Sequence, residues 1–443
     1  RGRFRGFLYS YEMEGHVKQT VQRYLELSGK TVDTLKKVAT PCIDDHQIAP
    51  EGFEKGGTLA SVCARIVLKA LYLARMNRPD ILWSVNVLAR EVTKWTVACD
   101  KRLHRLISYM DSTKDYIQLC LVGDDPLDCK LALFSDASFA GDLRDSKSTS
   151  GGLLCIVGPS TYVPLEWMCK KQTAVSHSTS EAEVIALDAG ARMSGLPALL
   201  LWDLVIDVFE PDGRQTSKPA PLSLAELTLL QRQRYDLFGT IDYVPPSFPI
   251  SYGRAKLFIL EDNDAVIKMT IKERSPQMRH VARTHRVNLD WLFERLSRDP
   301  AIRIKHVGTK EQVADLLTKG SLTGEAWAAL CSLALILSAS KVKTLKSPAG
   351  VTPVLSHAIK SNHRLSCVFN DPASVASFAF SSDSLSKLQP CAFAFLFTQS
   401  LCVRSMSSSQ GSNMNEQAAS ASAWLAPAQG LVHTDVDSEE YQQ

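Results

Sequence analysis

The sequence predicts an α/β fold built on a mixed sheet, preceded by a mainly helical segment and followed by a tail that we expect to be disordered. Two observations predict the sheet. Three short β-rich runs follow one another between residues 131 and 168, and strand and helix patterns then alternate up to residue 319. With 443 residues, 45% apolar and 22% charged, the chain has the profile of a soluble globular protein of two or three domains.

The first segment, 1–128, has four helical patterns. Apolar residues recur at helical spacing over 12–27 and 59–76, and Pro79 suits the first turn of a third helix. A fourth pattern covers 101–110. This segment is therefore expected to form a helical subdomain.

The second segment, 129–320, is predicted to hold five strands. They cover 131–136, 152–157, 162–168, 256–260 and 301–307. Helices are predicted from within 178–183 and over 264–271, 287–296 and 311–319. The Pro-rich stretch 210–254 is interpreted as an insertion that projects from the sheet.

The last segment, 321–443, is rich in Ser and poor in charge from about residue 340, which predicts disorder. The apolar run 326–339 is shorter than the ~18 residues of a membrane helix, so no membrane partner is expected. The eleven Cys are scattered without a Cys-x-x-Cys pair, which predicts neither a zinc module nor a disulfide framework. The chain begins at Arg1, so we expect it to be a piece of a longer protein.

Four acidic residues lie mostly at ends of predicted elements, where a mixed sheet gathers its functional sites: Asp136, Glu183, Asp262 and Asp315. Grouped carboxylates are costly unless cations neutralise them, and oxygen ligands favour Mg²⁺ or Mn²⁺. The pattern suggests hydrolysis of a phosphodiester bond with two metal ions.

Each of these acids also has a local structural explanation. Asp136 lies in a turn-like sequence, and Asp262 precedes a helix that it would cap. Ser180-x-x-Glu183 and Ser178-x-x-Glu181 each read as a helix capping box, and Asp315 is placed to pair with Lys319 four residues later. The functional interpretation therefore depends on the joint order of the four.

That order is part of a resemblance. The stretch FSDASFAGDLRDSKSTSGG at 134–152 closely resembles the start of the ribonuclease H domain in copia-type LTR retrotransposon polyproteins. Further blocks follow in the family's order: WMCKKQT at 167–173, SHSTSEAEVIAL at 176–187, EDNDAV at 261–266 and QVADLLTK at 312–319. Upstream, LYLARMNRPDILWSVN at 71–86 resembles the segment that follows the palm of the same family's reverse transcriptase.

The resemblance implies a ribonuclease H-like fold and assigns roles. Asp136, Glu183, Asp262 and Asp315 match the four catalytic carboxylates, which would hold two Mg²⁺ or Mn²⁺ ions. The implied reaction is endonucleolytic cleavage of RNA paired to DNA, with no small-molecule cofactor. The implied partners are the hybrid duplex and the rest of the Pol polyprotein upstream, and the implied location is intracellular, in a cytoplasmic virus-like particle or the nucleus.

A basic stretch provides a candidate track for the nucleic-acid backbone. Positively charged residues are dense between 268 and 286, whereas the whole chain has a net charge of only +3. Because local charge attracts phosphates, five residues are predicted to contact the duplex: Lys272, Arg274, Arg279, Arg283 and Arg286. The alternative is a solvated loop. His280 is a candidate for moving protons near the metals.

Two features limit the resemblance. Where the family usually has Lys-His-Ile-Asp, this chain has Arg279-His280-Val281-Ala282, so Ala282 replaces the Asp. Cys42-Ile-Asp-Asp45 superficially resembles a polymerase motif, but its flanks favour a solvated turn. The main alternative function is an inactive retroelement remnant that only binds nucleic acid.

Overall fold

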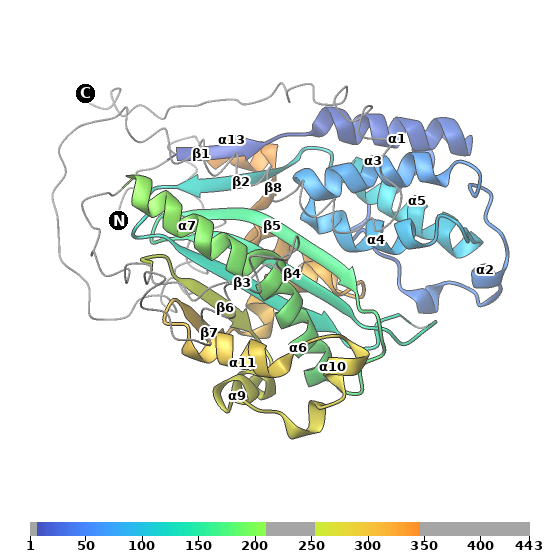
Figure 1. Cartoon of the computed structure of the whole chain (residues 1–443). Helices are drawn as coiled ribbons and strands as arrows, with labels where there is room; N and C mark the ends of the chain where they lie inside the picture. Colours follow the sequence, from blue (N-terminus) through green and yellow to red (C-terminus); the bar gives the residue numbers. More distant parts are fainter. Residues whose placement is uncertain (1–6, 143, 210–252, 346–443) are drawn as a thin grey trace, which may run out of the picture.

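The computed structural model describes residues 7–142, 144–209 and 253–345, and it is a mixed α/β fold around one mixed sheet (Figure 1). The predicted insertion 210–254, apart from its last two residues, and the chain beyond residue 345 lie outside the described residues. The strands lie in the order β1-β2-β5-β4-β3-β6-β7, and β8 pairs with β2.

The five predicted strands are all present. They are β3 (Lys130–Ser138), β4 (Thr149–Val157), β5 (Tyr162–Lys171), β6 (Leu257–Glu261) and β7 (Ile302–His306). The first three form an antiparallel meander, as their short connections require, and β6 and β7 add parallel strands beside β3. The register places Asp136 opposite Gly151.

The prediction of five strands is wrong in number, because the described sheet has eight. The extra strands are β1 (Phe7–Tyr11), β2 (Tyr116–Val122) and β8 (Ile336–Ser338). Two of them belong to the segment expected to be helical, and β8 belongs to the expected tail. Ile117 and Leu119 on β2 and Ile336 on β8 are buried, so the apolar side chains that drive this pairing meet only in the folded chain.

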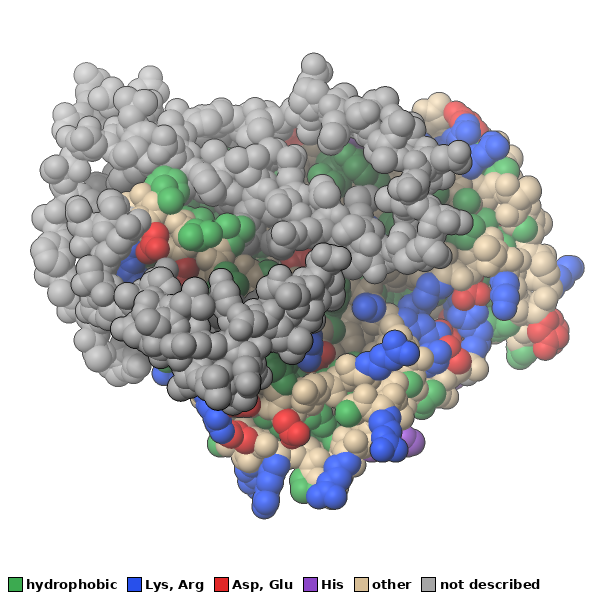
Figure 2. Space-filling model, in the orientation of Figure 1, with side chains coloured by type: hydrophobic (Ala, Val, Ile, Leu, Met, Phe, Trp, Pro, Cys, Tyr) green, Lys and Arg blue, Asp and Glu red, His purple; other side chains and the backbone are tan. Residues whose placement is uncertain are grey.

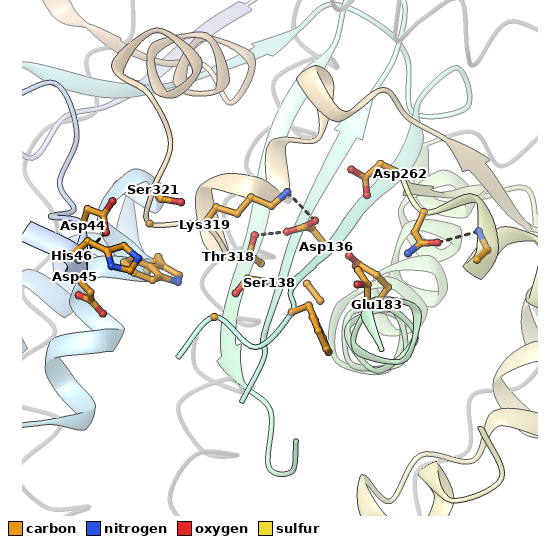
Figure 3. Close-up of a pocket in the computed structure, with 18 of the residues that line it drawn as sticks. Asp44, Asp45, His46, Asp136, Ser138, Glu183, Asp262, Thr318, Lys319 and Ser321 are labelled. Atoms are coloured by element: carbon orange, nitrogen blue, oxygen red, sulfur yellow. Dashed lines mark hydrogen bonds and ion pairs between the residues drawn. The ribbon is translucent and has the colours of Figure 1, made fainter. Parts of the chain in front are cut away.

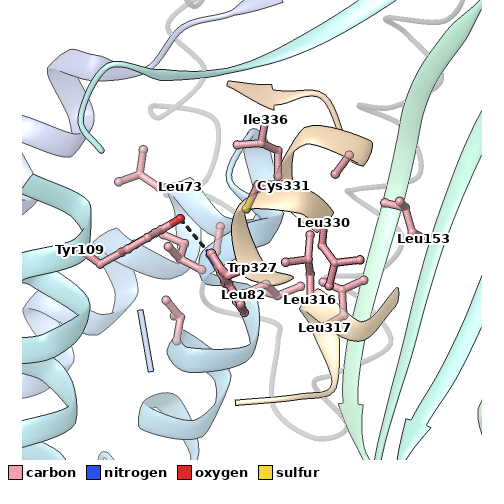
Figure 4. Packing of buried hydrophobic residues seen from close by; sticks show 14 of the residues in the cluster. Leu73, Leu82, Tyr109, Leu153, Leu316, Leu317, Trp327, Leu330, Cys331 and Ile336 are labelled. Carbon is pink, nitrogen blue, oxygen red and sulfur yellow. Dashed lines mark hydrogen bonds between the residues drawn. The ribbon is translucent and has the colours of Figure 1, made fainter. Parts of the chain in front are cut away.

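The prediction that the tail is disordered is also wrong for its first part, residues 324–345. Residues 324–345 form α12 (Gly324–Leu333), β8 and α13 (Ala339–Leu345). The low charge of this stretch reflects burial, because Trp327, Leu330 and Cys331 lie in the hydrophobic core (Figure 4).

The predicted N-terminal helices are present as α1 (Glu14–Ser28), α3 (Cys63–Met76), α4 (Leu82–Arg90) and α5 (Val97–Ser112), together with the short α2 (Glu51–Glu54). Their apolar faces share a core with one face of the sheet, to which β3 and β4 contribute Ala132, Phe134, Leu153 and Cys155. The intervening residues Leu131, Leu133 and Leu154 belong to a second core. This alternation shows that the sheet is covered on both faces.

The second core is covered by α6 (Thr179–Gly190), α7 (Leu196–Phe209), α9 (Asp264–Ile271) and α11 (Leu289–Arg298), with the short α10 (Val281–Thr284) between the last two (Figure 1). A π-helical turn, Ala191–Gly195, joins α6 to α7, so Thr179–Phe209 is one helix whose mean hydropathy reaches 1.4. By length and composition this helix could span a membrane, although no membrane-spanning segment was predicted from the sequence. However, 67% of the tested window is buried inside the protein, as in the core helix of many soluble proteins.

A buried ion pair joins the N-terminal helices to the C-terminal part of the described chain. Arg78 donates to both carboxylate oxygens of Asp80 at 2.8 Å, and Tyr109 also donates to Asp80 at 2.9 Å. The Tyr109 hydroxyl accepts from the indole of Trp327 on α12 at 3.1 Å (Figure 4). Arg78 also donates to Thr113, so these buried groups satisfy one another.

Candidate metal site and its cleft

Three of the four predicted carboxylates converge at one edge of the sheet. One oxygen each from Asp136, Glu183 and Asp262 lie within 4.8 Å of one another (Figure 3). Asp136 lies on β3, Glu183 on α6 and Asp262 directly after β6. We call these three residues the acidic triad.

Local structure explains the convergence. Strands β3 and β6 are parallel neighbours, with Phe134 paired to Leu260, so Asp136 and Asp262 follow at the same edge. The helix α6 approaches β3 closely because small residues meet there: Ala182 and Ala186 on the helix and Ala137 on the strand form a buried cluster. This close approach brings Glu183 to the same edge.

The hydrogen bonds at the start of α6 show which of the two predicted capping boxes forms. The Ser178 side chain accepts from the backbone N–H of Glu181 at 3.1 Å, and Glu181 accepts from His177 N–H at 3.0 Å. The box is therefore Ser178-x-x-Glu181. Glu183 lies inside the helix, which removes its proposed capping role.

Gathering three carboxylates in this buried place disfavours their charged forms. Burial raises the pKa of Asp136, and burial together with the Asp136 charge raises the pKa of Glu183 to about 9. Neither the Oε2 atom of Glu183 nor that of the fully buried Glu261 has a hydrogen-bond partner. Three carboxylates with an unpartnered buried oxygen fit a hard divalent cation, which takes oxygen ligands.

Asp315 is placed differently. It lies in a 3-10 turn, Val313–Leu317, where a helix over 311–319 was predicted, and it is not among the residues that line the cleft. Its Oδ1 atom lies 2.6 Å from the Nζ atom of Lys319, so the pair suggested by their spacing is present. Burial, followed by the charge on Asp136, raises the pKa of Asp315 to about 7.

The triad opens into a cleft of about 940 Å³. Its other wall comes from the N-terminal segment and the turn after Lys319, and includes Asp44, Asp45, His46 and Ser321 (Figure 3). The segment 42–45, interpreted from the sequence as a solvated turn, does lead into a turn, with Asp44 exposed. It nevertheless lines the same cleft as the triad. Only tertiary structure brings these segments together, so no local pattern predicts this wall.

His280 does not line the cleft. Its Nε2 atom lies 3.1 Å from Glu181 Oε2, and Nε2 of the buried His285 lies 3.3 Å from the other oxygen of Glu181. The His280 ring also packs edge-on against His177, with centroids 4.9 Å apart. These contacts attach the segment that carries His280 to the start of α6.

The predicted basic residues surround that attachment point. They extend from the end of α9 through α10, and all five are exposed: Lys272, Arg274, Arg279, Arg283 and Arg286. Figure 2 shows Lys and Arg side chains gathered along the lower edge of the molecule, where α9, α10 and α11 lie. Exposed basic side chains can bind a polyanion, and exposure alone is equally consistent with side chains that contact only solvent.

Two contacts of Asp136 were missed from the sequence. The Thr318 hydroxyl donates to Asp136 Oδ2, and Lys319 Nζ lies 3.5 Å from its Oδ1. Thr318 and Lys319 follow Asp315 in the QVADLLTK block, which was the available signal. Their contact with a residue more than 180 positions away is a product of folding.

No protein-family model and no solved structure matches the chain. Relatives named retrovirus-related Pol polyproteins do match. The one from transposon TNT 1-94 of Nicotiana tabacum is 28% identical over 199 residues, which cover 42% of this chain and 14% of that protein. The one from transposon RE2 of Arabidopsis thaliana is 26% identical over 314 residues, 69% of this chain and 17% of that protein.

The chain thus spans less than a fifth of these polyproteins. A shorter relative, named secreted RxLR effector protein 161, comes from Plasmopara viticola. It is 33% identical over 123 residues, which cover 28% of this chain and 81% of the relative. The chain therefore belongs to the same family as this Plasmopara protein and is similar to parts of the Pol polyproteins of copia-type transposons.

Proposed function

We propose that the chain is a ribonuclease H-type endonuclease that cleaves the RNA strand of RNA–DNA hybrids, as part of a copia-type Pol polyprotein. The observation that carries this proposal is the acidic triad, assembled from two strand ends and a helix that are far apart in sequence. Similarity to retrotransposon Pol polyproteins supplies the context in which hybrids arise.

The composition of the cleft supports a role for metal ions. Its described lining includes six acidic residues, namely Asp44, Asp45, Asp136, Glu183, Asp262 and Asp264. A phosphodiester that enters this cleft meets strong repulsion unless cations neutralise the acids. Asp136, Glu183 and Asp262 would hold Mg²⁺ or Mn²⁺, which when bound would activate the attacking water and stabilise the leaving 3′ oxygen.

The remaining roles belong to the chain's own residues. The basic residues between Lys272 and Arg286 would hold the phosphate backbone, and Glu181 would keep their segment beside α6 through its two histidine contacts. His280 would then act on the orientation of this segment rather than on a reacting atom. We propose an intracellular location, where such hybrids are made.

The test is cleavage of a hybrid with a labelled RNA strand in Mg²⁺ and in EDTA. Asp262→Asn removes a triad charge, whereas Asp264→Asn removes an exposed charge two positions later in the same cleft. We expect cleavage only with the metal, products with 3′-hydroxyl and 5′-phosphate ends, and loss of cleavage in Asp262→Asn alone. An equal loss of cleavage in both variants would contradict the assignment of Asp262 to the metal site.

An inactive remnant that only binds nucleic acid is the second candidate, and Ala282 favours it, because the resembled family has Asp there. A chain that binds hybrid with ordinary salt dependence yet cuts none in Mg²⁺ or Mn²⁺ would establish this alternative.

A further inference from the structure

Lys319 has an unusual position in the cleft. Among the described residues that line the cleft, it is the one Lys or Arg, beside six acidic residues, and its side chain points toward Asp136 (Figure 3). Its side chain is 31% exposed, so it is reachable from the cleft while most of its length is covered. Apart from the exposed His46 on the opposite wall, Lys319 is therefore the basic side chain that the described chain brings to this cleft.

Its ammonium group joins two buried carboxylates. Lys319 Nζ lies 2.6 Å from Asp315 Oδ1 and 3.5 Å from Asp136 Oδ1, and those two side chains are 6% and 2% exposed. An ammonium group has three N–H donors, so two carboxylates leave one for a ligand. Burial opposes the charge on Lys319, but Asp136, Asp315 and Asp262 together outweigh it and raise the pKa of Lys319 above its ordinary value.

The backbone that carries Lys319 is fixed against the sheet. The turn Val313–Leu317 buries Leu316 and Leu317 in the core, and it packs on β4 at Gly151. A Cβ atom at Gly151 would lie 2.5 Å from Thr318 Cγ2 and 3.2 Å from the Ala314 carbonyl oxygen. Only glycine allows this approach, and Gly151 is the residue paired with Asp136 across the two strands.

We propose that Lys319 is the built-in cation of the site: Asp315 anchors it, it neutralises part of the charge on Asp136, and it donates to a phosphate oxygen of the bound strand. Asp315 then positions Lys319 beside the triad. This inference rests on the proposed function, because it names a substrate-contacting group within the same cleft.

The first measurement is Mn²⁺ affinity, obtained by counting free Mn²⁺ with electron paramagnetic resonance. Lys319→Gln removes a positive charge beside the triad, so Mn²⁺ should bind about tenfold more tightly. Lys319→Arg keeps the charge and should stay within about twofold of the unmodified protein. Lys310→Gln, at an exposed lysine in the preceding turn, is the matched control and should change nothing.

The second measurement is hybrid binding with Ca²⁺ in place of Mg²⁺, so that a hard cation neutralises the acids of the cleft, and gel electrophoresis checks that the hybrid stays uncut. Lys319→Gln should weaken binding about threefold to tenfold and reduce the slope of log affinity against log salt by roughly one unit, as for one lost phosphate contact. The far-ultraviolet circular dichroism spectrum establishes that each variant is folded before it is compared.

The outcomes separate two failures. A folded unmodified chain that neither binds Mn²⁺ nor cuts hybrid overturns the proposed function, and this inference with it. If the unmodified chain binds Mn²⁺ and cuts hybrid, but Lys319→Gln leaves the Mn²⁺ affinity unchanged or weakened, only the proposal that Lys319 is the built-in cation is overturned. Tighter Mn²⁺ binding with an unchanged salt slope overturns the phosphate contact.

Discussion

The Arg78–Asp80 cluster and the acidic triad both bury charge, and they do so in opposite ways. In the first, Arg78, Asp80, Tyr109 and Thr113 satisfy one another, and Trp327 extends the network to α12. In the triad, three carboxylates share one cleft, and Glu183 retains an unpartnered oxygen. The difference indicates that the first cluster supports the fold, whereas the second is compatible with a bound divalent metal.

The largest expected effect is on cleavage. Asp136→Asn nearly keeps the shape of the side chain but removes one of the three charges that would hold the metal, so hybrid cleavage should fall by orders of magnitude. The same change should alter the stability of the metal-free protein only modestly, because the relief of burying a charge on Asp136 is offset by the loss of its ion pair with Lys319. Initial rates in Mg²⁺ and urea unfolding in EDTA check the two parts. Full activity in a folded Asp136→Asn variant would mean that the active site lies elsewhere.

In the Arg78–Asp80 cluster, by contrast, loss of an acidic charge should lower the stability of the protein. Asp80→Asn leaves the fully buried Arg78 guanidinium without its compensating charge, which should lower the free energy of unfolding by about 3–5 kcal/mol. Urea unfolding in EDTA measures the change, and Asp111→Asn, at a half-buried acid on the same N-terminal layer, is the control. If Asp80→Asn were neutral for stability, the contrast between the clusters would be lost.

A smaller expected effect is the dependence of protein stability on pH. In the metal-free protein the pKa of Glu183 is raised from an ordinary 4.5 to about 9, so the folded state holds a proton that the unfolded state has released. Stability from this group is complete below about pH 4.5 and is lost as the pH rises toward about 9. Thermal unfolding in EDTA at pH 6 and pH 8.5 should therefore show a lower midpoint at the higher pH.

Saturating Mn²⁺ should reverse this loss, because ligands of the folded state stabilise it by mass action, by about 2.7 kcal/mol at a hundredfold excess over Kd. In Asp136→Asn the rescue should be much smaller. An equal Mn²⁺ shift in both proteins would place the bound metal outside the triad.

The smallest effect is expected from the exposed basic segment. Replacing Arg279 and Arg283 by Ala should weaken hybrid binding and reduce its salt slope by roughly one unit per lost phosphate contact, with little change in the rate at saturating substrate. Lys18→Ala, an exposed lysine paired with Glu14 on α1, is the control. A salt slope that does not change would leave these arginines as solvated surface.

The strands of the meander were predictable, because short β-rich runs between turn residues are a local property of the sequence, and so was the start of α6 at its Ser178 cap. Three triad positions were identified through their motifs. In contrast, β2 pairs with β8 across more than 200 positions and with β1 across more than 100, and no local pattern contains these partners. The Lys319–Asp136 contact has the same origin, since it depends on how a turn packs against β4 at Gly151.

The most direct test of the central claim is anomalous diffraction from crystals of the unmodified chain grown with Mn²⁺. We predict a Mn²⁺ peak bounded by carboxylate oxygens of Asp136, Glu183 and Asp262, at roughly 2.1–2.3 Å from them, and no comparable peak at the Arg78–Asp80 cluster. A triad that stays empty at a Mn²⁺ concentration that supports cleavage would contradict the claim.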